Sequence, residues 1–252
     1  MIDLTFANPY HHNETIPGSL LALLTVCIPI AIFFIVGNCL GPRGDFHAVL
    51  CMYLLAMASK IFVVAIMKNY AGYFRPSFYN MCQFNKDTLV CDDETTSARE
   101  SFPSGHAATA LSSMTMVALF LLGKVRGGTR QRGVSAKPLT AEAIQDCIWT
   151  PSLLEKPLAV LAVSPMVLGI FIATSRVRDN WHHPADVICG GIIGIACALF
   201  AHSLWFPSVY SYYAGIPLET VRDIVTEKKA RSELGAANEM RLNSDDDDLN
   251  VL

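Results

Sequence analysis

Long apolar stretches separated by shorter polar segments dominate this sequence. Five of them are long enough to be membrane spans, at about residues 18–40, 46–67, 107–123, 157–174 and 187–206. A helix that crosses the hydrocarbon core of a bilayer needs roughly 20 mostly apolar residues, so the third and fourth stretches are at the short end of that range. The pattern predicts an all-α fold, a polytopic membrane helical bundle of about five spans.

The composition agrees with a membrane protein. Of the 252 residues, 52% are hydrophobic and 16% are charged, and the mean hydropathy of +0.37 argues against a soluble protein. No basic segment precedes the first apolar run, and that run is too long for the core of a secretory signal. The net charge of −3 has no uniform sign along the chain, which argues against nucleic acid as a partner.

The polar segments alternate between the two sides of the membrane. Segments 68–106 and 175–186 are separated by two spans, so they lie on the same side. The loop 124–156 lies on the other side and carries six basic residues against few acidic ones, which predicts a cytoplasmic position. The first two segments then face the lumen or the cell exterior. The same alternation places residues 1–17 in the lumen and the C-terminal tail in the cytoplasm.

We therefore expect two regions in the chain. Residues 1–206 form a membrane-embedded domain, and residues 207–252 form a cytoplasmic acidic tail. The tail becomes charged after Pro217 and ends near the run from Asp245 to Asp248. This composition predicts disorder, with a short helix over 218–236.

The eight cysteines do not form a dense disulfide framework. Cys82 and Cys91 share one polar loop, so they form a disulfide if that loop faces an oxidising lumen, and are two free thiols otherwise. No cysteine and histidine spacing resembles a zinc site. The glycosylation sequon at Asn13 falls on the predicted lumenal side, but it is so close to the first span that we expect it to be unused.

One ionisable residue, Lys60, lies in the middle of the second span. A charge at that depth is costly and usually faces the interior of the bundle or a wet cavity. Three interpretations stay open: Lys60 pairs with a partner, it supports a site two turns away at Lys68, or it reaches for the membrane interface.

Three polar clusters follow or precede the apolar stretches, and the first contains Lys68 and Arg75. The two side chains are two helical turns apart and can project from one face of a helix. Pro76 disfavours helix at Arg75, so we expect the helix to end there, with the guanidinium near the membrane surface. Arginine and lysine are suited to binding phosphate oxygens. Alone, however, this pair is better explained as an interfacial pair that anchors the end of a helix.

The second cluster is Pro103-Ser104-Gly105-His106, directly before the third apolar stretch. Ser104 is a candidate N-cap, and Gly105 lets the backbone approach a ligand closely. The free N–H groups at such a helix start favour an anion. His106 is placed to protonate a leaving oxygen. The alternative is an ordinary helix cap followed by a chance histidine.

The third cluster comprises Ser175-Arg176, His182 and Asp186. His182 and Asp186 are four residues apart and share a face if the segment is helical. A carboxylate bonded to one imidazole nitrogen leaves the other nitrogen free to attack phosphorus. A lone pair of this kind is more often structural than catalytic, and His183 and Arg178 remain alternatives.

In order and spacing, the three clusters resemble the motifs of the type 2 phosphatidic acid phosphatase family, in its eukaryotic lipid phosphate phosphatase branch. That pattern is Lys, six residues, Arg-Pro; then Pro-Ser-Gly-His; then Ser-Arg, five residues, His, three residues, Asp. The resemblance covers about residues 3–206. It implies an integral membrane enzyme that needs no magnesium or other cofactor. Its substrates would be lipid phosphates such as phosphatidate, lysophosphatidate, diacylglycerol pyrophosphate and sphingoid phosphates.

The resemblance also implies roles for the residues. His182 would attack phosphorus to form a phosphohistidine, Asp186 would orient and polarise it, and His106 would protonate the leaving alcohol. No residue would serve as a metal ligand. The phosphoryl oxygens would be bound by a further set, with Ser175 in support: Lys68, Arg75, Ser104, Gly105 and Arg176.

The chain departs from that family in one respect. Members of the branch usually have six spans, with one before the stretch that resembles residues 3–17, so this is either a five-span form or a chain that lacks its first span. Two other functions fit the same pattern: a catalytically silent membrane scaffold, or a phosphatase for prenyl pyrophosphates or sugar phosphates. The sequence does not specify the preferred lipid, the oligomeric state, or whether an endomembrane or the plasma membrane holds the protein.

Overall fold

A computed structural model describes residues 4–9, 14–39, 45–85, 87–88, 90–91, 96–134 and 155–249. Within these ranges, five helical segments are long and apolar enough to cross a membrane, at Gly18–Asn38, Asp45–Ala71, Gly105–Gly127, Glu155–Arg178 and Pro184–Trp205. The predicted all-α bundle of five spans is thus confirmed. The glycosylation sequon at Asn13 and most of the loop 124–156, from 135 to 154, lie outside the described residues.

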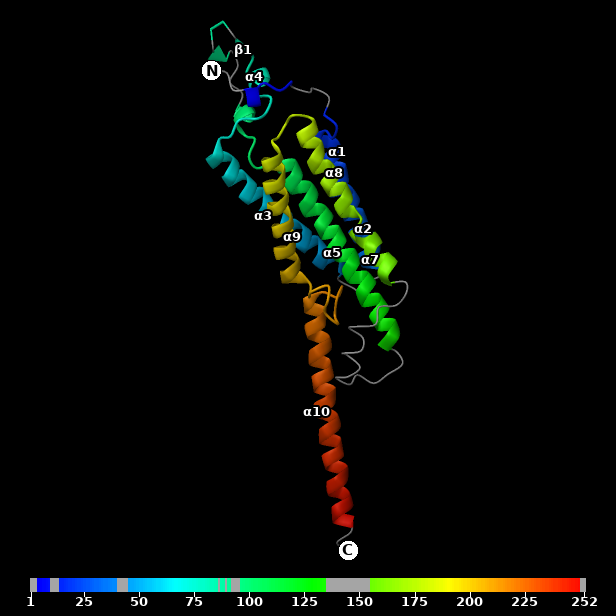
Figure 1. The fold of residues 1–252 in the computed structure, drawn as a ribbon. Helices are drawn as coiled ribbons and strands as arrows, with labels where there is room; N and C mark the ends of the chain where they lie inside the picture. Colours follow the sequence, from blue (N-terminus) through cyan, green and yellow to red (C-terminus); the bar gives the residue numbers. More distant parts are fainter. Residues whose placement is uncertain are drawn as a thin grey trace.

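The five segments are built from eight helical elements (Figure 1). The first segment is continuous but changes from α to π and back: α1 (Gly18–Ala22), η2 (Leu23–Cys27) and α2 (Ile28–Cys39). The second is α3 (Asp45–Ala71), and the third is α5 (Gly105–Val134). The fourth and fifth are α7 (Glu155–Val163) with α8 (Pro165–Arg178), and α9 (Pro184–Trp205).

The fourth segment, expected as one helix over 157–174, is interrupted at Ser164. Pro165 has no N–H with which to continue the helical hydrogen bonds, and its ring crowds the preceding turn. The hydroxyl of Ser164 instead donates to the carbonyl of Leu161 at 2.8 Å. Helices α7 and α8 therefore meet at this residue.

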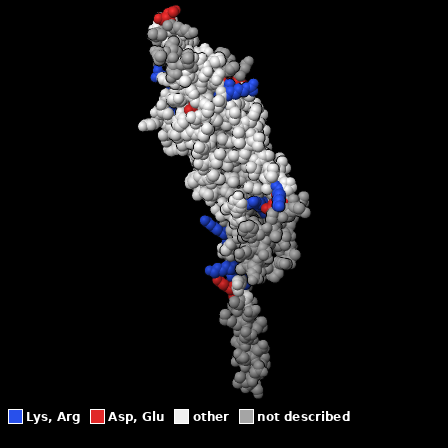
Figure 2. Space-filling model, viewed as in Figure 1, with Lys and Arg blue, Asp and Glu red and all other residues white. Residues whose placement is uncertain are grey.

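Helix α5 lies at the centre of the bundle, in contact with α3, α7, α8 and α9. Its middle is buried and includes polar residues such as Ser112 and Ser113. In contrast, large apolar side chains are exposed on the surrounding helices, among them Phe34, Phe62, Leu161, Val167, Phe171, Ile192 and Phe200. In the view of Figure 2, charged side chains lie toward the two ends of the bundle and uncharged residues form the band between them. This distribution is that of a bundle whose outer surface faces lipid.

Two glycines of α9 bring its backbone close to α5. A Cβ atom added at Gly190 would lie 2.4 Å from the carbonyl oxygen of Ser104, and one added at Gly194 would lie 2.3 Å from that of Ala108. Real side chains do not tolerate such distances, so only glycine allows this approach. The close packing holds the N-terminal ends of α5 and α9 together.

Short elements form the connection between α3 and α5. They are α4 (Phe78–Met81), the strands β1 (Phe84–Asn85) and β2 (Val90–Cys91), and η3 (Thr96–Arg99); η1 (Leu4–Phe6) precedes the first segment. The two strands pair antiparallel, with Phe84 opposite Cys91. Cys82 and Cys91 form a disulfide, which the sequence left open.

The C-terminal region contains one long helix, α10 (Leu218–Leu249), which extends away from the bundle at the end opposite the N-terminus (Figure 1). The sequence predicted a mainly disordered tail with a short helix over 218–236, and the structure differs from that expectation. Ion pairs one turn apart stabilise such a helix. Arg231 and Glu227 are 2.7 Å apart, and Lys229 and Glu233 are 4.0 Å apart.

Candidate active site

The three polar clusters of the sequence meet at one end of the bundle, where α3 and α8 end and where α5 and α9 begin (Figure 1). The backbone N–H of Ser104 donates to the carbonyl of Asp186 at 3.0 Å, which joins the second cluster to the third. The guanidinium of Arg75 lies 4.8 Å above the ring of Trp181, which joins the first cluster to the third. The structure thus brings together the residues singled out on the sequence.

The first cluster is built on the end of α3, which comes earlier than predicted. The helix ends at Ala71 rather than near Arg75, so that prediction was wrong. The reason is Gly72, which has a φ of 54°, a left-handed conformation that terminates helices. Arg75 therefore lies beyond the helix, where its Nε donates to the carbonyl of Ser97 at 2.7 Å. Lys68 remains on α3, and its Nζ donates to the carbonyl of Glu100 at 3.0 Å.

The second cluster begins α5 as predicted. The helix starts at Gly105, and the buried hydroxyl of Ser104 accepts a hydrogen bond of 3.4 Å from the N–H of Ala107. A Cβ atom added at Gly105 would lie 4.0 Å from Cε of Lys68. The start of α5 therefore faces the lysine of the first cluster, and its first N–H groups lie beside a cation.

The Nε2 atom of His106 is buried and has no hydrogen-bond partner among the described residues. Its ring interacts electrostatically with Lys68, Arg75, Arg176 and His182, so it lies among residues of both other clusters. It also borders a cavity of about 300 Å³. An unpaired buried polar atom beside a cavity is a place for a ligand oxygen or a water.

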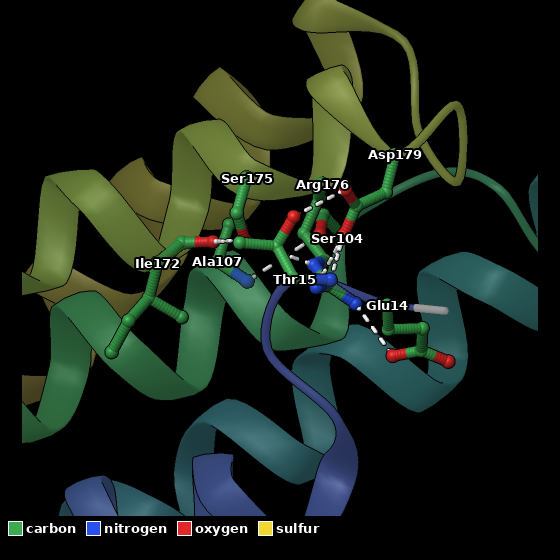
Figure 3. A network of polar contacts seen from close by, with 8 residues as sticks. All are labelled: Glu14, Thr15, Ser104, Ala107, Ile172, Ser175, Arg176 and Asp179. Carbon is green, nitrogen blue, oxygen red and sulfur yellow. Dashed lines mark hydrogen bonds and ion pairs between the residues drawn. The ribbon is translucent and has the colours of Figure 1, made fainter. Parts of the chain in front are cut away.

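Arg176 is the most buried cation of the third cluster, with 1% of its surface exposed. Its guanidinium donates to Glu14 at 2.8 Å, to Asp179 at 3.0 Å and to the hydroxyl of Ser175 at 3.3 Å (Figure 3). The Ser175 hydroxyl in turn donates to the carbonyl of Ile172 at 2.7 Å. Two carboxylates compensate the burial of this charge.

The segment before the first span contributes residues that the sequence did not single out for this site. Besides Glu14, the hydroxyl of Thr15 donates to Asp179 at 2.6 Å, and its backbone N–H donates to the same carboxylate at 2.8 Å (Figure 3). The N–H of Asn8 donates to the carbonyl of Pro76 at 3.1 Å. This segment therefore ties the first and third clusters together from outside the bundle.

His182 is oriented by a residue that the sequence did not indicate. Its Nδ1 lies 2.7 Å from the backbone carbonyl of Ser101. Because a carbonyl only accepts hydrogen bonds, Nδ1 carries the proton and Nε2 carries the lone pair. Within the described part of the chain, Nε2 makes no hydrogen bond. The side chain itself is buried, with 3% of its surface exposed.

Asp186 does not make the direct hydrogen bond to His182 that the sequence predicted. Its Oδ2 is 3.8 Å from Nδ1, and it accepts instead from the hydroxyl of Ser101 at 2.5 Å and from the N–H of His183 at 2.9 Å. The physical reason is the start of α9 at Pro184: His182 precedes the helix, and Asp186 caps its first turn. Ser101 thus connects the two residues: its hydroxyl donates to Asp186, and its carbonyl accepts from His182.

The two alternatives raised by the sequence lie elsewhere. The Nε2 of His183 is 3.2 Å from the carbonyl of Phe74, and its ring packs against Phe6 and Tyr73. Arg178 is exposed at the end of α8. Of the histidine pair, His182 is the one whose free nitrogen is left for a ligand.

Burial is the main influence on the charge of His182, and it lowers the pKa of this residue to about 4. The nearby carboxylate of Asp186 acts in the opposite direction, and the positive charges of Arg75 and Lys68 lower the pKa further. At neutral pH the imidazole is therefore uncharged, and its lone pair is available at Nε2.

This pKa predicts the pH dependence of any reaction in which His182 acts as a base or nucleophile. The reactive neutral form persists from neutral pH down to about pH 5 and is lost as the pH falls through about 4, because the pKa in the folded protein lies below the ordinary histidine pKa of about 6.5. The measurement is kcat/KM as a function of pH, with the ionisation of the substrate phosphate followed by ³¹P NMR and corrected for. After this correction, we expect the loss of kcat/KM at acidic pH that is due to the enzyme to occur near pH 4. A loss near 6.5 in protein that remains folded would contradict this assignment.

The described residues contain no group of three His, Cys, Asp or Glu side chains that could hold a metal ion. Positive charge at the site comes instead from Lys68, Arg75 and Arg176 and from the start of α5. These groups suit an anion with several oxygens, since arginine and the helix N-terminus both donate hydrogen bonds to phosphate.

Comparison with known proteins identifies the family. Residues 49–210 match the PAP2 superfamily. The chain belongs to the PAP2 superfamily. The match includes all three clusters, and with five apolar helical segments this PAP2 protein is a multi-pass membrane protein.

Several curated PAP2 relatives are similar to the chain along most of its length. A protein of Arabidopsis thaliana named probable lipid phosphate phosphatase 4 is 29% identical over 244 residues, which are 92% of this chain and 71% of that protein. Diacylglycerol pyrophosphate phosphatase 1 of Saccharomyces cerevisiae is 26% identical, over 90% of this chain and 76% of that protein. Lipid phosphate phosphatase 2 of Arabidopsis thaliana is 26% identical, over 79% of this chain and 64% of that protein. No solved structure gives a significant match.

Proposed function

We propose that this protein is a membrane phosphatase that removes phosphate from lipid phosphates through a phosphohistidine. The observation that carries the proposal is the state of His182: its Nδ1 is bonded to the Ser101 carbonyl, its Nε2 is left without a hydrogen bond, and the ring feels the positive charges of Arg75 and Lys68. A neutral imidazole held in this way is a nucleophile, and the cations attract its phosphoryl target. The names of the relatives, lipid phosphate and diacylglycerol pyrophosphate phosphatases, support the same class of substrate.

In the first step, Nε2 of His182 attacks phosphorus and the bond from phosphorus to the lipid oxygen breaks. The bonding electrons leave with that oxygen, which takes a proton from His106. Lys68, Arg75 and Arg176 hold the three remaining phosphoryl oxygens, with the hydroxyl of Ser104 and the N–H group of Gly105. Asp186 acts on His182 through Ser101 and stabilises the positive charge that forms on the imidazole.

In the second step, water attacks the phosphohistidine. His106, now neutral, takes a proton from this water, and the bond from phosphorus to Nε2 breaks. Inorganic phosphate leaves, and His182 returns to its neutral form with the proton still on Nδ1. The same ring therefore serves first as acid and then as base, as microscopic reversibility requires.

Substrates that fit the proposal are phosphatidate, lysophosphatidate, diacylglycerol pyrophosphate and sphingoid phosphates. A site at the end of a bundle lets the acyl chains stay in lipid while the phosphate reaches the cations. We place this end on the lumenal or extracellular side. The disulfide between Cys82 and Cys91 supports that side, because disulfides persist in oxidising compartments. Lys124 and Arg126, near the C-terminal end of the third span, lie at the other end, as in segments that face the cytoplasm.

The test is phosphate release from detergent-solubilised protein supplied with phosphatidate. We expect the rate to be the same with EDTA as with magnesium, because protein cations hold the phosphate. Rapid denaturation in alkali during turnover of ³²P-labelled substrate should trap a protein-bound phosphate that is stable in base and labile in acid. Loss of release in EDTA would contradict the metal-independent mechanism, and the absence of release under all conditions from folded protein would favour the silent scaffold.

A further inference from the structure

The cavity beside His106 extends from the site into the membrane-spanning part of the bundle. It has a volume of about 300 Å³. At its upper end are Lys68, Gly105 and His106, which belong to the site, and the rest of its wall comes from α1, α3 and α5: Leu21, Lys60, Ile61, Val64, Ala65 and Thr109. Ile61 and Ala65 are exposed on the lipid-facing side of α3, so the cavity lies at the surface that meets the bilayer.

Lys60 is the charged residue of the lower wall, and only 7% of its surface is exposed. Its ammonium group donates a hydrogen bond to the hydroxyl of Thr109, which itself donates to the carbonyl of Gly105 at 2.8 Å. Among the described residues, no carboxylate lies within ion-pair distance of Lys60. Two other cations of the bundle do have carboxylate partners: Lys124 pairs with Asp45, and the buried Arg176 pairs with Glu14 and Asp179.

A buried ammonium with one hydroxyl partner has donors to spare. Lysine offers three N–H donors, and a charge at this depth in a membrane usually faces a functional cavity. Reaching for the membrane interface, one of the alternatives raised by the sequence, does not describe Lys60, because its ammonium is fixed on Thr109 inside the bundle. Its free donors border the cavity and require an acceptor there.

The depth of Lys60 indicates which acceptor it meets. Thr109 lies four residues after Gly105 on α5, which is about 6 Å farther into the bundle at the helical rise of 1.5 Å per residue. In a glycerolipid, the acyl ester carbonyls follow the phosphate by a few bonds. A lipid with its phosphate at the start of α5 and its chains in the bilayer therefore places its ester groups near Lys60 and Thr109.

We propose that Lys60, held by Thr109, is a specificity-determining residue that binds the acyl ester carbonyl of a glycerolipid phosphate. This inference rests on the proposed function and adds the substrate class: acylated glycerol phosphates in preference to ether-linked or sphingoid phosphates. An ether oxygen is a weaker acceptor than an ester carbonyl. A sphingoid base brings an ammonium group to this region, which the charge of Lys60 repels.

The test compares Lys60→Met with the wild type on three phosphate monoesters that differ in the group attached to the phosphate. They are diacyl phosphatidate, its dialkyl ether analogue and para-nitrophenyl phosphate. A charge-assisted hydrogen bond is lost only with the ester, so we expect kcat/KM for phosphatidate to fall at least about tenfold. We expect the rates with the other two to be unchanged. Thr109→Val should give a smaller loss with the same selectivity, and Lys156→Met, an exposed lysine on α7, should change nothing.

An equal loss with all three substrates would overturn the inference, since Lys60 would then act on the phosphate or on the fold. Unchanged kcat/KM for phosphatidate in folded Lys60→Met would overturn it as well. If wild-type protein hydrolyses none of the three, the proposed function fails, and binding decides the inference instead. In native mass spectrometry, the wild type should then retain phosphatidate better than its ether analogue, and Lys60→Met should retain both equally. Equal retention of the two lipids by the wild type would refute the subsite.

Discussion

Replacing His182 by alanine is expected to abolish phosphate release. In the proposed mechanism this residue supplies the lone pair that attacks phosphorus, whereas the unbonded nitrogen of His106, the other histidine beside the cations, serves only in proton transfer. Removal of a catalytic nucleophile costs other hydrolases about 10⁴-fold or more in kcat, and we expect a loss of at least this size. The measurement is single-turnover phosphate release from purified protein, together with trapping of the labelled phosphoenzyme.

The neighbouring histidine provides a matched control for this experiment. His183→Ala removes an imidazole of the same size, one residue away, that contacts the carbonyl of Phe74 rather than the cations. We expect it to retain trapping of phosphate and most of the activity. Turnover in folded His182→Ala protein, or a reversed order of the two variants, would rule out His182 as the nucleophile. Size-exclusion chromatography in detergent establishes that each variant is folded.

Replacing Gly190 by alanine is expected to have the second largest effect. The added Cβ would lie 2.4 Å from the carbonyl oxygen of Ser104, so α9 and α5 must move apart by about 1 Å. Ser104 and Asp186 are hydrogen-bonded across this interface, and the shift would separate the second cluster from the third. A misplacement of that size costs about 10²-fold in rate, and overpacking costs about 1–3 kcal/mol of folding free energy.

Gly18→Ala is the matched control, because Gly18 also lies in a membrane-spanning segment and an added Cβ there meets no atom within 4 Å. It should change neither activity nor thermal stability. The measurements are kcat/KM with phosphatidate and the unfolding temperature in detergent. Full activity of Gly190→Ala would show that the two helices do not need their close approach.

The sequence allowed prediction of the spans and the clusters because both depend on local patterns. An apolar stretch of about 20 residues is visible without knowledge of its neighbours, and alternation of sides follows from counting the spans. The prediction that the clusters share one end rested on this counting alone. The start of α5 at Gly105 was likewise predictable, since Ser104 is a residue that commonly caps helices.

The contacts that orient the site depend on distant parts of the chain, and they were not predictable. Ser101 acts on His182 through its backbone carbonyl, which every residue type possesses, so its side chain gave no signal. Glu14 reaches Arg176 across 162 positions of sequence. The early end of α3 depends on the left-handed backbone at Gly72, which the neighbouring Arg75-Pro76 pair obscured.

The lipid-facing side chains beside the cavity have a consequence for how the enzyme meets its substrate. Ile61 and Ala65 border the cavity and are exposed where acyl chains surround the bundle. If the substrate is a lipid phosphate as proposed, we expect it to enter by lateral diffusion in the plane of the membrane, without transfer through water. The quantity that governs occupancy is then the mole fraction of substrate among the surrounding lipids, so at constant molarity the rate should fall as inert lipid or detergent dilutes that surface.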